Sequence, residues 1–470
     1  MSSAAVEVVS KETIKPTTTT SYQLRNFNLS LLDQYIPAIY VPIILFYPAA
    51  VSNSKHHDDL DLLKSSLSET LAHFYPMAGR MKDNIMVDCN DEGIDFLEVK
   101  IKGKMCDFMT KPDVPLSLLL PSDVVSMNFV REAQVVVQVN MFDCGGTAIC
   151  LCVSHKIADA CTISTFIRNW AATTNSARCR GANIVVPTTN QNVFPSFDSA
   201  SLFPPSEQLV YPSGLPPILP YPTEDNRGDK VVTKRFVFDA VKITSVREKL
   251  QVLMQDNYKY RRPTRVEVVS ALIWKSVIKS APAGSSSRVN HAVNFRRKMD
   301  PPLQDVSFGN LCVVATAVLA ATRTATPTNK TVGSKSNEVQ VALTELSEFV
   351  AQLRGEIDKV KGDKGCMEKI ALNFFNGYDA IDASNSVNDN VRDEAIALWM
   401  VSWCNFGLYD ADFGWGKPIW VTTDPFIEQN KNIVYMNDTK CGQGIEVWVK
   451  FLEDDMAKFE LNLSEILDLI

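Results

Sequence analysis

The feature that most constrains this chain is the stretch of residues 147–160, which reads TAICLCVSHKIADA. Residues 147–154 form an almost unbroken apolar run directly after the turn-forming sequence DCGG, a pattern typical of a buried strand. The run ends at His155, and Asp159 follows where a helix is expected to start. Because mixed sheets commonly present catalytic groups at their strand ends, the stretch predicts a functional histidine at the end of a buried strand.

His155 is the best candidate for chemistry among the five histidines of the chain. An imidazole titrates near pH ~6.5, so it can take a proton from a hydroxyl group and return it later. Asp159 could orient the ring, or its carboxylate could turn away and anchor the loop. The structural alternative is a buried histidine satisfied by backbone groups, with Asp159 as a helix cap.

Length and composition indicate an ordinary globular protein. A chain of 470 residues exceeds the usual single-domain range, so two domains are expected. Hydrophobic residues make up 46% of the chain and charged residues 21%, which is typical of globular proteins. The net charge of −7 argues against a nucleic-acid partner.

Targeting signals are not expected in this sequence. The N-terminus lacks the long apolar core of a signal peptide, and the apolar residues 36–51 are too few to span a bilayer. The eleven cysteines show no disulfide-framework spacing, which fits free thiols in a reducing compartment. We therefore expect a cytoplasmic protein without a membrane partner.

The order of elements suggests where the domains divide. Residues 33–47 look like a strand, and residues 57–74 carry leucines near helical spacing. Residues 183–230 are crowded with proline, serine and asparagine, which is typical of a linker. We predict an N-terminal domain at 1–190, a crossover linker at 191–230 and a C-terminal domain at 231–470.

A basic cluster precedes a predicted helix in the C-terminal domain. Lys259, Arg261 and Arg262 come just before Thr264 and Glu267, which have the spacing of a capping box. Positive side chains beside a helix N-terminus suit a phosphate group. A solvated charge cluster is an equally good explanation, and the negative charge of Glu267 weakens the case for an anion site.

A second motif, YDADFGWGKP at residues 409–418, suggests a family. Its Asp-Phe-Gly segment is not that of a kinase, because the chain lacks a His-Arg-Asp catalytic loop and a phosphate-cradling glycine loop. Together with the His-x-x-x-Asp motif at residue 155, it resembles the plant BAHD acyl-CoA-dependent acyltransferases. The blocks YPMAGR at 75–80, NFRRKMDPP at 294–302 and FGNL at 308–311 extend the resemblance over most of the chain.

The resemblance implies a mixed α/β (α+β) fold with two chloramphenicol-acetyltransferase-like domains that enclose a solvent tunnel. It implies acetyl-CoA as co-substrate, no metal ion, and His155 as the general base that faces the tunnel. Asp159 would turn away and pair with Arg296, and Trp403 would help to hold the oxyanion. The family threonine two residues before that tryptophan is replaced by Val401, so its role in acceptor binding does not carry over to this chain.

The resemblance also assigns supporting roles to other residues. The loop after residue 411 would be structural, through Asp412, Phe413, Gly414, Trp415 and Gly416. The residues expected to bind the cofactor are Arg262, Thr264, Asn294 and Asn310.

The implied acceptor is a small-molecule alkaloid. Residues 2–16, 140–150, 242–259 and 451–467 resemble the acetyltransferases of benzylisoquinoline alkaloid pathways. The expected acceptor is the 7-hydroxyl of salutaridinol, and the enzyme is expected to be a monomer. Another alkaloid hydroxyl is the alternative, as is a non-catalytic alkaloid-binding protein.

A covalent mechanism is a further alternative, with Cys152 as acyl carrier, since a thiolate beside a histidine is a strong nucleophile. On a strand, however, Cys152 and His155 have opposite parity, so their side chains face opposite ways. Direct transfer between the two substrates is therefore expected.

Overall fold

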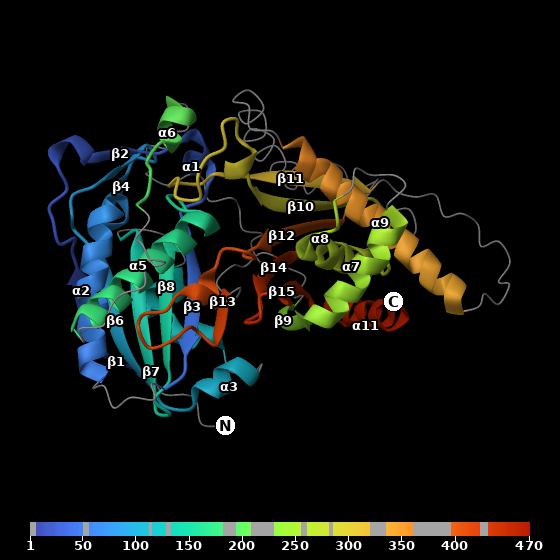
Figure 1. Ribbon diagram of the computed structural model, residues 1–470, viewed down its shortest axis with the longest axis horizontal. Helices are drawn as coiled ribbons and strands as arrows, with labels where there is room; N and C mark the ends of the chain where they lie inside the picture. Colours follow the sequence, from blue (N-terminus) through green and yellow to red (C-terminus); the bar gives the residue numbers. More distant parts are fainter. Residues whose placement is uncertain are drawn as a thin grey trace. The chain divides into compact units, whose positions relative to one another are not determined.

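The structure is a computed structural model of the chain (Figure 1). It describes residues 6–49, 56–111, 115–127, 133–181, 194–207, 230–254, 261–281, 285–319, 335–360, 396–423 and 431–470. Among the helices in these ranges, none combines the length and apolar character needed to cross a membrane.

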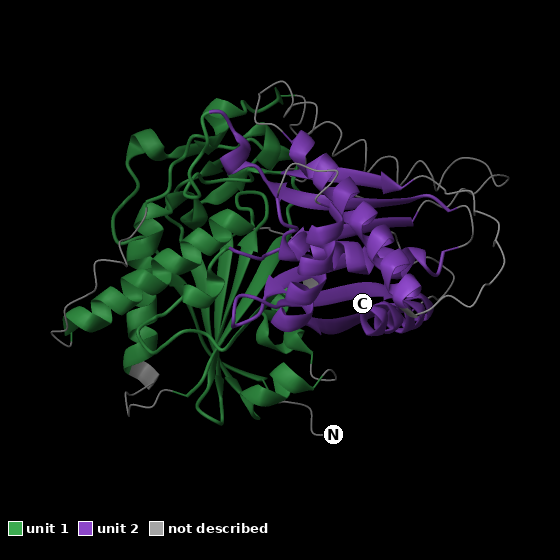
Figure 2. Ribbon diagram, turned by 45° about the vertical axis from the view of Figure 1, so that its right-hand side comes forward, with its two compact units in different colours: residues 1–221, 301–312, 406–428 green, residues 222–300, 313–405, 429–470 purple. Residues whose placement is uncertain are grey.

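The chain forms two compact units, coloured separately in Figure 2. Unit 1 contains residues 1–221, 301–312 and 406–428, and unit 2 contains residues 222–300, 313–405 and 429–470. Two short segments from the second half of the sequence thus belong to unit 1. The predicted boundaries at 190 and 231 remain a prediction, because most of the expected linker lies outside the described residues.

Unit 1 is built on a mixed six-stranded sheet in the order β1-β6-β7-β8-β3-β13. Its strands are β1 (Val6–Ile14), β3 (Tyr40–Tyr47), β6 (Ile94–Ile101), β7 (Val135–Phe142), β8 (Thr147–Ser154) and β13 (Trp420–Thr423). The strand predicted at 147–154 is confirmed as β8, which pairs antiparallel with both β7 and β3. Strands β6 and β7 pair parallel, so the sheet is mixed.

Helices α2 (His56–His73) and α5 (Ala160–Gly181) pack against each other and lie across a face of this sheet (Figure 1). A small sheet joins β2 (Asn26–Asn28), β4 (Arg80–Lys82) and β5 (Met86–Asp88). The shorter helices are α3 (Met105–Thr110), α4 (Ser122–Met127) and α6 (Ser199–Leu202).

The strand expected over residues 33–47 is wrong in its first part. Residues Leu31–Tyr35 form the short helix α1, and β3 begins only at Tyr40. The cause is a capping box, in which the Ser30 hydroxyl accepts from the Asp33 N–H and the Asp33 carboxylate accepts from the Ser30 N–H. This local pairing favours a helical turn over an extended chain, and it places Asp33 near the end of β8.

Unit 2 has a second mixed six-stranded sheet in the order β11-β10-β12-β14-β15-β9. Its strands are β9 (Val231–Phe238), β10 (Ser287–Asn294), β11 (Cys312–Leu319), β12 (Ile396–Ser402), β14 (Ile433–Asp438) and β15 (Ile445–Leu452). The pairs β10–β12 and β12–β14 are parallel, whereas β14–β15 and β15–β9 are antiparallel. Both units therefore have the mixed α/β character that the sequence predicts.

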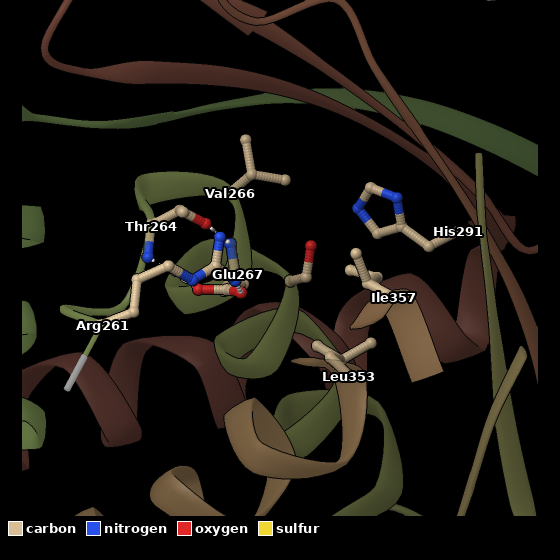
Figure 3. Close-up of a pocket in the computed structure, with 8 residues that line it drawn as sticks. Arg261, Thr264, Val266, Glu267, His291, Leu353 and Ile357 are labelled. Atoms are coloured by element: carbon tan, nitrogen blue, oxygen red, sulfur yellow. Dashed lines mark hydrogen bonds and ion pairs between the residues drawn. The ribbon is translucent and has the colours of Figure 1, made fainter. Parts of the chain in front are cut away.

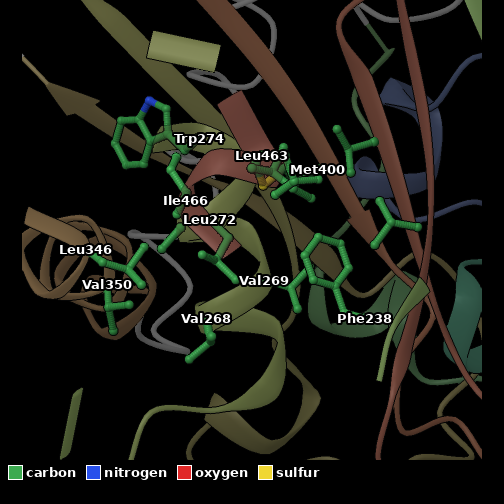
Figure 4. Packing of buried hydrophobic residues seen from close by; sticks show 14 of the residues in the cluster. Phe238, Val268, Val269, Leu272, Trp274, Leu346, Val350, Met400, Leu463 and Ile466 are labelled. Carbon is green, nitrogen blue, oxygen red and sulfur yellow. The ribbon is translucent and has the colours of Figure 1, made fainter. Parts of the chain in front are cut away.

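The core of unit 2 lies among its helices and this sheet (Figure 4). The helices are α7 (Ala240–Met254), α8 (Arg265–Ile278), α9 (Lys335–Lys359) and α11 (Glu453–Leu469). The apolar residues in the middle of α8, from Val268 to Trp274, are buried, and the Trp274 indole N–H donates to the Ser287 hydroxyl at 3.0 Å. This packing holds α8 within the core of unit 2.

Candidate active site

His155 is the first residue after β8, and the pairing of β8 on both sides fixes its place. Its backbone N–H donates to the Ile39 carbonyl at 2.8 Å, just before β3 begins. The side chain is half-buried. The sequence prediction that a buried strand ends at this histidine is therefore confirmed.

Asn310 holds the His155 ring in place. The side-chain oxygen of Asn310 lies 3.1 Å from His155 Nδ1. The amide nitrogen of Asn310 donates to the His155 carbonyl at 2.7 Å and to Asp33 Oδ1 at 2.9 Å. Because both of these partners are acceptors, the NH₂ group must face them, and the oxygen must face Nδ1. His155 Nδ1 therefore carries the proton, and the lone pair of Nε2 is left to accept one.

Asp33 supports Asn310 from the buried helix α1. Its Oδ1 accepts from the Asn310 backbone N–H at 2.7 Å, and its Oδ2 accepts from the Ser30 hydroxyl at 2.6 Å. The side chain is fully buried, and this burial raises the pKa of the Asp33 carboxyl, although the hydrogen bonds from Ser30 and Asn310 oppose the rise. Sequence reasoning missed Asp33, since residues 33–47 look like a strand.

Asp159 caps α5 and anchors a distant loop. One carboxylate oxygen accepts from the Thr162 N–H at 2.9 Å, and the other accepts from the Leu311 N–H at 3.0 Å. The Thr162 hydroxyl also donates to the Gly309 carbonyl at 3.0 Å. Of the alternatives open from the sequence, these contacts correspond to a helix cap and a loop anchor, and they bring Asn310 beside His155.

Gly309 allows this loop to pass close to α1 and α6. Its φ of +118° is a conformation that favours glycine, and an added Cβ would lie 3.0 Å from the Ser199 hydroxyl and 3.5 Å from Asp33 Oδ1. Within the Phe-Gly-Asn block at 308–310, the glycine therefore allows the backbone to place Asn310 beside Asp33 and His155.

The loop at residues 409–418 is tied to unit 1. Asp412 Oδ1 accepts from the backbone N–H groups of Gly414 and Gly416 at 2.8 and 2.9 Å. The fully buried Phe413 ring packs edge-on against Trp170 of α5, with ring centroids 4.9 Å apart. Trp415 stacks on Phe413 at 5.6 Å. This packing between the loop and α5 supports a structural role.

Arg296, Asn294 and Trp403 are among the expected site residues that belong to unit 2. Arg296 is completely buried, and its backbone N–H and guanidinium both donate to the Asn294 side-chain oxygen, at 3.1 and 3.2 Å. Trp403 follows β12 and is 5% exposed, and its backbone N–H donates to the Met436 carbonyl at 2.7 Å. The expected pairing of Arg296 with Asp159 remains a prediction.

The start of α8 has the predicted capping box. The Thr264 hydroxyl accepts from the Glu267 N–H at 3.1 Å, and the Glu267 carboxylate accepts from the Thr264 N–H at 2.7 Å. Arg354 from α9 lies 3.0 Å from the same carboxylate, and Arg261 lies 2.7 Å from it. Burial alone would raise the pKa of Glu267, but the hydrogen bonds from Arg354 and Thr264 and the charge of Arg261 hold it below its usual value.

A cavity of about 140 Å³ adjoins this cluster within unit 2 (Figure 3). It is lined by Arg261, Thr264, Val266, Glu267, Ser270, His291, Leu353 and Ile357. Figure 3 shows the His291 ring across this space from Arg261 and Glu267. His291 is 6% exposed, its Nδ1 lies 3.0 Å from the Ala292 carbonyl, and its Nε2 has no hydrogen-bond partner among the described residues. Burial lowers the pKa of His291, which favours the neutral ring.

Of the expected basic cluster, Arg261 and Arg262 are described by the structure, whereas Lys259 lies outside the described residues. Arg262 points to Glu248 at 3.5 Å, whereas Arg261 lines the cavity and Arg354 neutralises Glu267. Sequence reasoning missed Arg354 and His291, which come from α9 and β10, because no local pattern links them to α8. Within the described ranges, no three His, Cys, Asp or Glu side chains are grouped so that they could bind a metal ion.

Comparison with known proteins decides the family. The model of the Transferase family matches residues 4–466, which is nearly the whole chain. The chain belongs to the BAHD transferase family. It is therefore an enzyme of the acyltransferase class, as the two sequence motifs predict.

This BAHD transferase is similar over its full length to two enzymes of Papaver somniferum. It is 70% identical to (13S,14R)-1,13-dihydroxy-N-methylcanadine 13-O-acetyltransferase AT1, covering 100% of this chain and 99% of the relative. It is 67% identical to salutaridinol 7-O-acetyltransferase, with the same coverage.

Solved structures share the fold of this BAHD transferase. The crystal structure of vinorine synthase is 31% identical, with a TM-score of 0.72 and coverage of 98% of both chains. F. sporotrichioides TRI101 in complex with coenzyme A and T-2 is 18% identical, with a TM-score of 0.63 and coverage of 92% of this chain and 96% of TRI101. The second likeness concerns the fold alone.

Proposed function

We propose that this enzyme transfers the acetyl group of acetyl-CoA to a hydroxyl group of a benzylisoquinoline-type alkaloid. The observation that carries the chemistry is the His155 ring, whose Nδ1 is held by Asn310 so that Nε2 can accept a proton. The acceptor class rests on the two Papaver somniferum relatives, whose names both describe O-acetylation of an alkaloid. A monomer in the cytoplasm remains part of this proposal.

The reaction we propose is direct transfer. His155 Nε2 takes the proton of the acceptor hydroxyl while that oxygen attacks the carbonyl carbon of the thioester. The tetrahedral intermediate collapses, the carbon–sulfur bond breaks, and His155 returns the proton to the leaving thiolate. The O-acetyl ester and CoA are the products. Trp403 is proposed to stabilise the oxyanion, as the family resemblance implies.

The proposed acetyl-CoA site includes the start of α8. The pair of Arg261 and Arg354 outweighs the single negative charge of Glu267, so this helix start is suited to a phosphate group. Of the expected contacts Arg262, Thr264 and Asn294, Thr264 lines the cavity. We assign Asn310 to the positioning of His155, because its side chain bonds to His155 and Asp33.

Two acceptors are candidates. The sequence stretches favour salutaridinol at its 7-hydroxyl, and the relative with 70% identity favours the 13-hydroxyl of a dihydroxy-N-methylcanadine. Purified enzyme should be incubated with acetyl-CoA and a panel of hydroxylated benzylisoquinoline alkaloids. Release of the CoA thiol and formation of an O-acetyl product, seen by mass spectrometry, identify the acceptor. Alkaloid binding without thiol release on the whole panel would favour the non-catalytic alternative.

Replacement of Cys152 by serine is expected to retain most activity. Cys152 is fully buried, and its sulfur lies 3.9 Å from the sulfur of Cys150 on the same strand. A thiol without solvent access cannot be reached by a thioester. Initial rates measured against acetyl-CoA at several acceptor concentrations should give intersecting lines. Parallel lines together with an acetylated Cys152 peptide would overturn direct transfer.

A further inference from the structure

Lys156, the residue directly after His155, is buried without a role in the proposed chemistry. Lys156 is only 1% exposed, and its amine donates to the carbonyls of Gln34 at 2.8 Å and Ile36 at 2.7 Å. Burying an amine is costly unless hydrogen bonds compensate. These two bonds fix the end of α1 to the turn that carries His155.

The same short helix reaches His155 by a second route. Asp33 of α1 bonds to both N–H groups of Asn310, and Asn310 bonds to the ring and to the carbonyl of His155. The contacts therefore form a closed ring, which runs from His155 through Asn310 and Asp33 to α1 and returns through Lys156. This closed set of contacts fixes the orientation of the His155 imidazole more firmly than Asn310 alone, because α1 cannot shift without breaking a hydrogen bond.

We propose that Lys156 is a positioning residue for His155. Lys156 anchors α1, so that Asp33 and Asn310 keep the imidazole of His155 in one tautomer. This inference rests on the proposed function, in which His155 Nε2 accepts the proton. Lys156 itself touches neither substrate nor the reacting atoms.

The protonation of Lys156 should make the stability of the enzyme depend on pH. Burial lowers the pKa of Lys156 to about 7, and the carboxylate of Asp33 opposes that decrease. Asp33 on α1 is the charged group that acts on it, and His155, its neighbour in sequence, is the other titratable group in this set of contacts. The unfolded chain has the ordinary lysine pKa of 10.5, so it binds more protons than the folded chain between about pH 7 and pH 10.5. The contribution of Lys156 to the free energy of unfolding should therefore rise with pH in that window.

The test replaces Lys156 by methionine, which keeps the apolar stem and removes the donor. We expect turnover to fall about tenfold, with the KM for acetyl-CoA unchanged, and the pH profile of turnover to shift. NMR of the imidazole nitrogens should show a loss of the Nδ1–H tautomer of His155. That measurement needs no acceptor, so its failure is distinct from a failure of the proposed function.

Tyr47→Phe is the matched control. It removes another buried hydrogen bond of unit 1, from the Tyr47 hydroxyl to the Ala411 carbonyl at 2.8 Å. It should lower the melting temperature and leave the His155 tautomer and the pH profile unchanged. If Lys156→Met does not fold, Lys156→Arg keeps a donor at a displaced position and should still shift the pH profile. A parental tautomer and profile in the folded variant would overturn the proposal.

Discussion

Replacing His155 with alanine is expected to lower turnover by about 10²–10⁴-fold, the usual contribution of a positioned general base. The variant should fold normally, because the side chain is half-buried and the strand that ends beside it is paired on both sides. Affinity for acetyl-CoA should be close to that of the parent enzyme. Turnover is measured with the acceptor identified above, and circular dichroism checks the fold.

His73→Ala is the control for this experiment. His73 ends α2, is exposed, and packs against Phe194 with ring centroids 4.5 Å apart. Its removal should leave turnover unchanged. If His155→Ala kept near-parental turnover, the proton acceptor would be another group, and the contact between Asn310 and His155 would not contribute to catalysis.

The part of the site that follows local sequence rules could be predicted. The apolar run at 147–154 after a glycine turn indicated β8, and the strand ends where His155 begins. The Thr264 and Glu267 spacing indicated the start of α8, which is present as a capping box. Both depend on residues within a few positions of one another, where steric and hydrogen-bonding preferences act directly.

The long-range partners of His155 could not be predicted from local rules. Asp33 and Asn310 lie 277 residues apart in sequence, and each is polar within a stretch that has its own local explanation. The Ser30 cap favours a helical turn, whereas the apolar run after it favours a strand. The cap prevails at Leu31–Tyr35, which form α1. A signal was present in the Phe-Gly-Asn block, but a family resemblance alone does not distinguish a cofactor contact from a partner of the histidine.

Replacing Asp159 with alanine should reduce both stability and activity. Asp159 is 4% exposed, its carboxylate accepts from the backbone N–H groups of Thr162 and Leu311, and its loss leaves both donors without that acceptor. The substitution also removes the proposed partner of Arg296, so we expect the free energy of unfolding to fall by about 3–5 kcal/mol. Activity should fall as well, because the Leu311 contact holds the loop that places Asn310. Chemical denaturation and turnover are measured on the same preparation.

Asp239→Ala is the matched control, since Asp239 also caps a helix. It accepts from the Lys242 N–H at 2.7 Å, but unlike Asp159 it is exposed. Its replacement should cost about 1 kcal/mol and leave activity unchanged. A loss for Asp159→Ala no larger than this would contradict the buried pair with Arg296. An Asp159→Ala enzyme that unfolds like the parent yet is inactive would instead indicate that Asp159 acts on His155 directly, because a cap and anchor cannot be removed without a cost in stability.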